Sequence, residues 1–196
     1  MLRDVAALVA FSLVSSGTPG PNNLVLWASG ARFGFGPTLP HVVGTSLGIG
    51  AMAAVVALGL GAFVAAVPAS QLALRVTGSL YLLYLAYQIA ASGALRRPEV
   101  ARPLRLGQAA LFQGLNPKAW IFALAAVGAF RPADLPVAPG SALVVVTMMV
   151  VVLPTAAAWA AGGTAIGRLL AGDRARRALS VGMAAVLAAS VVDLWI

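Results

Sequence analysis

The sequence predicts an all-α polytopic membrane protein with six transmembrane helices in a single domain. Of its 196 residues, 61% are hydrophobic and only 9% are charged. Apolar runs close to the ~20 residues that a bilayer-spanning helix needs recur along the whole chain. The basic residues lie mostly in the short connections between these runs, as is typical of proteins that cross a membrane several times.

We expect residues 1–196 to form one membrane domain with two halves. Residues 1–95 and 106–196 each hold three apolar runs, and a basic linker, residues 96–105, separates them. A net charge of +8 would favour nucleic acid as a partner in a soluble protein, but membrane topology explains the same arginines here. We therefore expect a lipid bilayer, and no nucleic acid, as the partner. Cysteine is absent, which excludes disulfides and thiolate chemistry.

Length and hydropathy predict the six spans, with boundaries defined to within several residues. The expected spans are Asp4–Ala28, Pro37–Val67, Gln71–Ala91, Leu106–Phe130, Ser141–Ile166 and Ala175–Trp195.

The first span contains the least helix-like stretch of the chain, Gly17-Thr18-Pro19-Gly20-Pro21-Asn22-Asn23. Its prolines remove backbone donors and its glycines loosen the chain. Broken backbone at bilayer depth survives only where neighbouring protein or a water-lined cavity satisfies the freed groups. The stretch therefore predicts a cavity in the middle of the bundle. No small-x-small cleavage site follows Met1-Leu2-Arg3, so we expect this run to remain as a helix instead of being removed as a signal peptide.

The second and third spans add packing and polar features. Gly44 and Gly48 have the small-xxx-small spacing that lets helix backbones approach closely. His41, the only histidine, could titrate and take part in coupling, although a lone histidine near a span end is more often interfacial. Tyr84 and Gln88 share a helical face with Tyr81. This stripe could line a substrate path, or it could be an aromatic belt with Gln88 bonded to another helix.

A second break, Asn116-Pro117-Lys118, interrupts the fourth span, and Lys118 lies about halfway along it. A charge at that depth costs a few kcal/mol even on lenient insertion scales, so Lys118 should face a cavity or a partner. In one interpretation it contacts an anionic substrate group or takes part in coupling. In the other it snorkels or binds exposed carbonyls at the break.

The remaining polar groups at the breaks also allow two interpretations. Asn22, Asn23 and Asn116, with the Thr18 hydroxyl, could recognise an amino and a carboxyl group together. Alternatively, the asparagines only cap helix segments. Pro154, in the fifth span, is a kink or a hinge for gating.

The distribution of arginine predicts the orientation. Connections one, three and five hold Arg32; Arg96, Arg97, Arg102 and Arg105; and Arg168, Arg174, Arg176 and Arg177. The opposite side has only Arg3, Arg75 and Arg131. By the positive-inside rule the arginine-rich connections are cytoplasmic, so both termini face outward.

Two halves of three spans each predict a 3+3 inverted repeat, because an odd number of crossings makes the second half enter from the opposite side. Each half begins with a span that proline breaks next to asparagine, Pro21-Asn22 in one and Asn116-Pro117 in the other. In transporters built from such repeats, paired broken helices mark a central binding site.

The residue inventory argues against an enzyme. The acidic residues lie near span ends or in connections and are Asp4, Glu99, Asp134, Asp173 and Asp193. With one histidine and no cysteine, the sequence shows no pattern that would pair a catalytic nucleophile with a base, and no cluster of metal ligands. We expect no metal and no cofactor.

Several short motifs follow one another along spans one to four. They are Thr18-Pro19-Gly20-Pro21-Asn22, Gly30-Ala31-Arg32-x-Gly34-x-Gly36, Gly44 with Gly48, Gly78-x-x-Tyr81-Leu82-x-Tyr84-Leu85, and Phe112-x-Gly114-x-Asn116-Pro117-Lys118. In combination they resemble the lysine exporter and homoserine/threonine resistance family (LysE/RhtB type) of bacterial amino-acid exporters. The last two spans agree with that family mainly in hydropathy.

The resemblance implies export of amino acids or related small metabolites across the bacterial cytoplasmic membrane, driven by the proton gradient. It assigns the substrate and gating region to Pro19, Gly20, Pro21, Asn22, Asn116, Pro117 and Lys118. Ser46 stands in the central second span, where some exporters of lysine and arginine carry an acid. This difference favours neutral amino acids and leaves the proton carrier unidentified.

Three hypotheses therefore compete. The first is a secondary exporter of a small molecule that works by alternating access around the two breaks. It could work as a single chain or as a homo-oligomer. The second is a transporter of another small metabolite or ion. The third is a membrane scaffold without transport, in which the breaks only pack helices.

Overall fold

The computed structural model describes residues 2–59, 68–94, 102–169, 173–192 and 195, and this part of the chain is helical without strands. The described helices are α1 (Leu2–Gly17), α2 (Pro21–Phe33), α3 (Phe35–Ala57), α5 (Pro68–Ala94), α6 (Leu106–Leu115), α7 (Pro117–Phe130), α8 (Val137–Leu169) and α9 (Asp173–Ala189). An all-α fold is thus confirmed.

Both expected helix breaks are present. Helix α1 ends at Gly17 and α2 begins at Pro21, while α6 ends at Leu115 and α7 begins at Pro117. Each second half-helix starts with proline, at the position where a missing N–H is not needed and the fixed φ suits a helix. The first break is shorter than the sequence indicates, because Pro21, Asn22 and Asn23 already belong to α2.

Two described helices, α3 and α8, are long and apolar enough to cross a bilayer. The breaks explain why the first and fourth expected spans do not pass the same test, since each is divided into pieces of 16 residues or fewer. Helix α8 has 33 residues, or about 50 Å at 1.5 Å per residue, which exceeds the ~30 Å apolar core of a bilayer.

Several other expected boundaries change. Helix α3 ends at Ala57. The last part of the expected second span, residues 60–67, and residues 96–101 of the basic linker lie outside the described residues. Pro154 lies within the continuous helix α8. Next to it, the Thr155 hydroxyl donates to Val152 O at 2.9 Å and to Val151 O at 3.2 Å, so the side chain adds hydrogen bonds around the proline.

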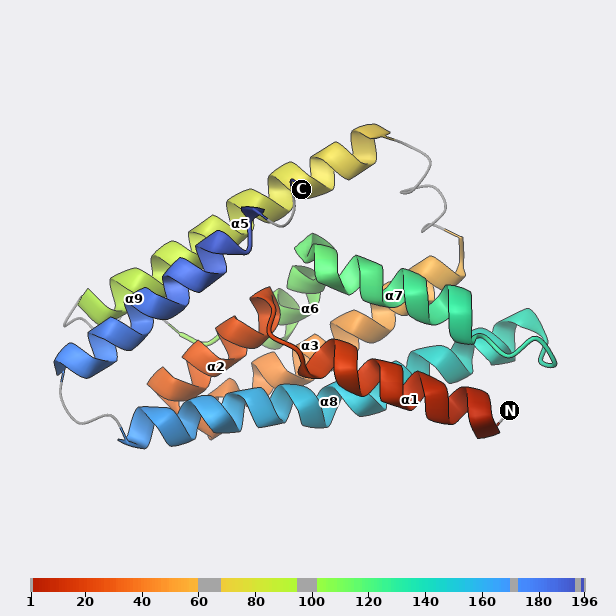
Figure 1. Ribbon diagram of the computed structural model, residues 1–196, viewed down its shortest axis with the longest axis horizontal. Coiled ribbons are helices and arrows are strands. Elements are labelled where there is room, and N and C mark those ends of the chain that lie inside the picture. The colour runs from red at the N-terminus through yellow and green to blue at the C-terminus, as the bar shows by residue number, and fades with distance from the viewer. Residues whose placement is uncertain (1, 60–67, 95–101, 170–172, 193–194, 196) are drawn as a thin grey trace.

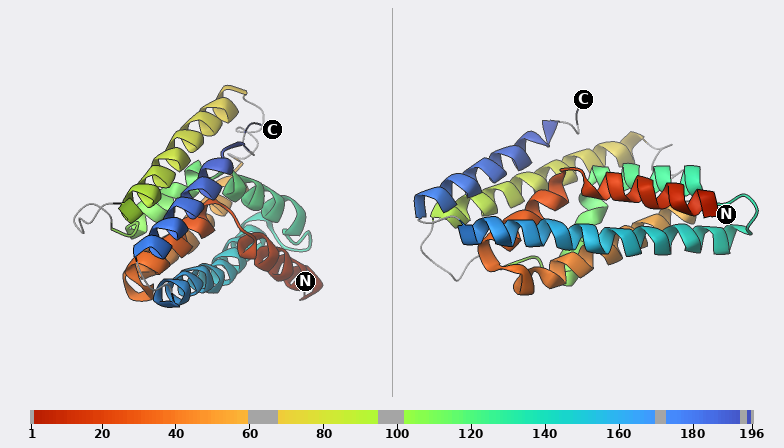
Figure 2. Two further views of the ribbon diagram at one scale, coloured as in Figure 1. Left: turned by 60° about the vertical axis from the view of Figure 1, so that its left-hand side comes forward. Right: turned by 60° about the horizontal axis from the view of Figure 1, so that its bottom comes forward.

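The helices form a bundle in which each broken pair packs against a long helix. Helices α1 and α2 pack on α8, and α6 and α7 pack on α3 (Figure 1). Helices α3 and α8 contact each other, and α5 and α9 run side by side along one flank (Figures 1 and 2). The second break is buried at Asn116, whereas Thr18 and Pro19 of the first break are exposed.

Glycine permits the closest helix contacts. A Cβ at Gly44 would collide with Leu106 O, and one at Gly48 would lie 2.6 Å from Ala110 O, so both glycines let α3 approach the α6 backbone. The predicted close packing at Gly44 and Gly48 is confirmed, and α6 is the partner. Gly30 on α2 and Gly163 on α8 have the same function at the α2–α8 contact.

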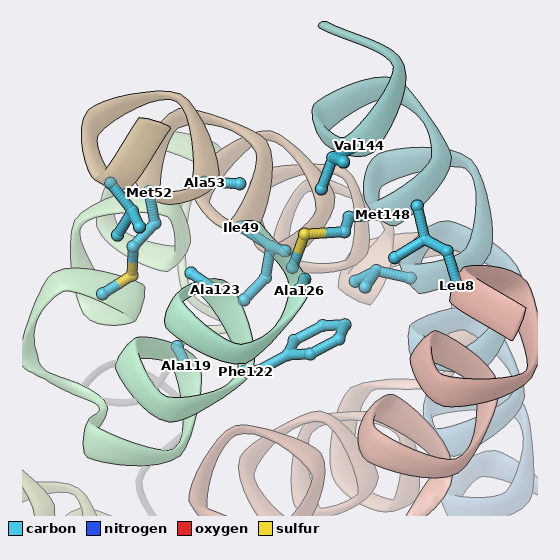
Figure 3. Close-up of a cluster of buried hydrophobic side chains, with 12 residues drawn as sticks. Leu8, Ile49, Met52, Ala53, Ala119, Phe122, Ala123, Ala126, Val144 and Met148 are labelled. Atoms are coloured by element: carbon cyan, nitrogen blue, oxygen red, sulfur yellow. The ribbon is translucent and has the colours of Figure 1, made fainter. Parts of the chain in front are cut away.

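Apolar cores lie on both sides of the breaks. One joins α1, α3, α7 and α8 through residues that include Leu8, Ile49, Phe122 and Met148 (Figure 3). Another joins α2, α5, α6 and α9 around Phe112. Asn22, Asn23 and Asn116 are buried together with these cores.

We expect Gly163→Ala to destabilise the bundle while Gly162→Ala leaves it nearly unchanged. A methyl at Gly163 would strike Trp27 O, a backbone atom that cannot move alone, whereas one at Gly162 would lie 3.6 Å from Trp27 Nε1, an ordinary contact. Overpacking of this kind costs about 1–3 kcal/mol. Thermal unfolding of both variants in detergent measures the difference, and equal midpoints would contradict the packing described.

Candidate functional site

The side chain of Lys118, at the start of α7, joins the two helix breaks. Its Nζ donates hydrogen bonds to Thr18 Oγ1 at 2.8 Å, to Thr18 O at 2.9 Å and to Pro19 O at 3.2 Å. These three contacts, here called the Lys118 bridge, match the three N–H donors of an ammonium group. The side chain thus reaches the first break across 100 residues of sequence.

Local structure explains why the ammonium group binds there. The carbonyls at the end of a helix lack intrahelical partners and carry the negative end of the helix dipole. Thr18 and Pro19 directly follow α1, so an ammonium group bound to their carbonyls lies at the negative end of that helix. Gly20 gives the lysine its space, because a Cβ there would lie 2.9 Å from Lys118 Cδ and 3.1 Å from Nζ.

Asn23 also satisfies the end of α1. Its Nδ2 donates to Ser16 O at 2.7 Å and to Thr18 O at 2.9 Å. Thr18 O therefore accepts hydrogen bonds from both Asn23 and Lys118. The capping interpretation of the asparagines fits Asn23, whereas Asn116 stands between α6 and α7 without a side-chain cap.

Asn22 is the centre of a second, buried polar cluster. Its Oδ1 accepts from Gln113 Nε2 at 2.9 Å and from Thr45 Oγ1 at 3.2 Å, and His41 Nε2 lies 3.4 Å away. Asn116 Nδ2 extends the cluster to Gln113 Oε1 at 3.4 Å. Helices α2, α3 and α6 and the second break are thereby connected through side chains.

Two buried atoms of this cluster have no hydrogen-bond partner among the described residues. They are His41 Nδ1 and Asn116 Oδ1. An unpaired buried polar atom costs about 1–3 kcal/mol, so such groups are usually retained where another molecule or another conformation pairs with them.

A small cavity of about 40 Å³ lies between the Lys118 bridge and the buried cluster. Its walls include Gly20, Asn22, Gln113, Asn116 and Lys118, and Phe122 and Val152 add apolar surface. About 10–15 Å³ is enough to admit one water molecule, so this space is large enough for water. The predicted cavity at the breaks is therefore present, in a narrow form.

A much larger cleft, of about 770 Å³, opens on the other side of Lys118. It lies between α5, α7 and α9, and the first break forms one of its walls. Its lining is mostly apolar, with Leu74, Ile121 and Val186 among the walls, and Arg75 adds a second basic side chain.

The structure brings most of the sequence-predicted residues together. Thr18 accepts from Lys118, and the other residues of the two breaks that line one or both cavities are Pro19, Gly20, Pro21, Asn22, Asn23, Asn116, Pro117 and Lys118. His41 reaches Asn22 and is fully buried, in contrast to the interfacial interpretation. Tyr84, Gln88 and Pro154 are outside the walls of both cavities, and their roles stay predictions.

Gln113 and Thr45 are not among the site residues predicted from the sequence, where Arg75 serves only to predict the orientation. Gln113 is 1% exposed and contacts both asparagines. A polar residue in an apolar run three positions before the second break was the available signal. Within the described ranges, three or more histidine or acidic side chains nowhere gather in a way that could hold a metal ion.

Comparison with known proteins gives a family match along nearly the whole chain. The LysE type translocator family matches residues 13–196. Curated relatives include proteins named "Cysteine/O-acetylserine efflux protein" from Escherichia coli strain K12 and from Shigella flexneri, each 27% identical over 127 residues. Those matches cover 64% of this chain and 65% of each relative, which is less than two thirds of their length. No solved structure matches.

We expect Gln113→Leu to lower the free energy of unfolding by about 1–3 kcal/mol. The change removes the donor that Gln113 offers to Asn22 and the acceptor that it offers to Asn116, while both asparagines stay buried. The matched control is Gln88→Leu, at a half-buried glutamine without a hydrogen bond among the described residues. Unfolding of both variants in detergent separates them. If the two were equally stable, the buried cluster would not contribute to stability as described.

Proposed function

Because this chain belongs to the LysE type translocator family, we propose that it is a secondary-active exporter of amino acids or related small metabolites, and not an enzyme. Its site of action would be the bacterial cytoplasmic membrane. The curated relatives are named for efflux of cysteine and O-acetylserine, two neutral amino acids, which supports the preference for neutral substrates drawn from Ser46.

The observation that carries the proposal is the Lys118 bridge. A cation at the interface of two broken helices, next to a polar cavity, is typical of a site where a transporter holds a small charged molecule. A scaffold that only packs helices would need neither the buried cluster around Asn22 nor a cleft of about 770 Å³. The site proposed for substrate and gating comprises Thr18, Pro19, Gly20, Pro21, Asn22, Asn23, Asn116, Pro117 and Lys118.

We further propose six spans in a 3+3 inverted repeat. In this arrangement α1–α2, α3 and α5 form one half, and α6–α7, α8 and α9 form the other. The contact pattern supports it, because exchanging the halves turns the packing of α1 and α2 on α8 into that of α6 and α7 on α3. Such repeats work by alternating access, as one half rocks against the other around the central site.

The cleft between α5, α7 and α9 would be the exit route in this mechanism. Its walls come from the first part of α5 and the last part of α9, the ends that the arginine distribution puts outside, together with α7 beyond the second break. Both termini would then face outward. Substrate would leave past Lys118 and Arg75 into this cleft.

Proton antiport is the proposed energy source. Lys118 and His41 are the titratable residues at the breaks and in the buried cluster next to them. A proton bound or released there would alter the hydrogen bonds of Lys118 to Thr18 and of His41 to Asn22. Whether one copy works alone or in a homo-oligomer does not alter this site, which a single chain forms.

Export of labelled cysteine or O-acetylserine from loaded proteoliposomes tests the function. The wild type should release substrate in response to an imposed proton gradient, and collapse of the gradient should stop it. We expect Lys118→Ala to reduce the rate by about tenfold or more, since hydrogen bonds to a charged group are worth about 1.5–3 kcal/mol and 1.4 kcal/mol corresponds to tenfold.

Arg131→Ala, which removes an exposed arginine after α7, is the control and should export at the wild-type rate. A lack of flux with any amino acid would contradict the proposed function. If Lys118→Ala inserted normally and exported at the wild-type rate, Lys118 would have no part in the mechanism.

A further inference from the structure

The oxygen atoms that hold Lys118 form a binding site for an ammonium group. Three acceptors, Thr18 O, Thr18 Oγ1 and Pro19 O, surround Nζ at 2.8–3.2 Å. All three belong to one short segment directly after α1, at the negative end of that helix. Nothing in their arrangement requires that the ammonium group belong to a lysine.

An amino acid carries the same group. Its α-ammonium has three N–H donors and one positive charge, as the lysine side chain has. We propose that the acceptors of Thr18 and Pro19 bind the substrate's amino group, and that Lys118 holds this place until a substrate replaces it. The proposal rests on the proposed export of amino acids and states how their amino group is recognised.

The exchange conserves charge at the first break. One ammonium group leaves the carbonyls and another arrives, so these acceptors stay paired and the local charge stays the same. The released Lys118 then needs a new partner, because an unpaired charge at this depth is costly. The carboxylate of the same substrate can supply it, as a charge-assisted hydrogen bond.

Geometry permits the exchange. Lys118, Pro19 and Gly20 line the large cleft, so the lysine and the residue that provides one of the three acceptors border it. Thr18, which provides the other two, is exposed at the surface. The lysine also lines the small cavity with Asn116, whose Oδ1 is unpaired. Gly20 offers no side chain that would hinder movement of the lysine stem, which packs directly over it.

This arrangement selects for zwitterions. A carboxylate without an amino group would draw Lys118 away and leave the carbonyls of Thr18 and Pro19 without a cation. An amine without a carboxylate would release Lys118 without giving it a partner. Only a molecule that carries both an amino group and a carboxylate gives a partner to the carbonyls of Thr18 and Pro19 and to Lys118. This requirement matches the proposed amino-acid substrates and explains why both groups are needed.

Chemical rescue tests the exchange directly. Lys118→Ala should unfold at a lower temperature than the wild type, and methylammonium should restore part of the loss by binding to the vacated acceptors. Tetramethylammonium, which has the same charge but no N–H donor, should not. Neither ion should stabilise the wild type, because Lys118 already holds the site. Lys118→Met, which keeps an apolar stem, serves if the alanine variant does not fold.

The proposal is overturned if methylammonium stabilises the variants no more than tetramethylammonium does, or stabilises the wild type equally. This outcome leaves the proposed export untouched, since the flux of the wild type from proteoliposomes is measured independently of the rescue by these ions. Conversely, methylammonium could stabilise the variants while the wild type exports no amino acid. The protein would then have an ammonium site without the proposed function, and the assignment of that site to a substrate's amino group would fail.

Discussion

The ammonium group of Lys118 on the carbonyls of Thr18 and Pro19 is the interaction on which the rest of the structure depends. A break in a membrane helix leaves carbonyls without partners, and a lysine at bilayer depth lacks water; each alone would be costly. Together they offset one another. The chain can therefore keep two irregular backbone segments next to each other, with its only lysine between them.

The surrounding fold holds these two segments at the required separation. Gly44 and Gly48 bring α6 against α3, which fixes the second break relative to α3. Asn22 then receives Thr45 from α3 and Gln113 from α6, so the first break is connected to the same framework. Apolar packing on both sides keeps the polar groups together, while the narrow cavity and the larger cleft leave them room to exchange partners.

The sequence predicts the local features and misses the pairings. Proline beside asparagine marks both breaks, and the glycine spacing marks the close helix contact, because these depend on backbone chemistry within a few residues. That Lys118 binds Thr18, and Gln113 binds Asn22, depends on how distant helices pack, and one sequence shows no sign of it. The extents of α3 and α8 differ from expectation because hydropathy does not mark where a helix ends.

A double-mutant cycle between Lys118→Met and Thr18→Val measures the Lys118 bridge most directly. Thr18→Val removes the hydroxyl acceptor and keeps the shape of the side chain. If the two side chains interact as described, the losses in unfolding free energy are not additive, and the coupling amounts to about 0.5–3 kcal/mol. Strictly additive losses would contradict the account, because they would mean that the Lys118 ammonium group and the Thr18 hydroxyl stabilise the protein independently.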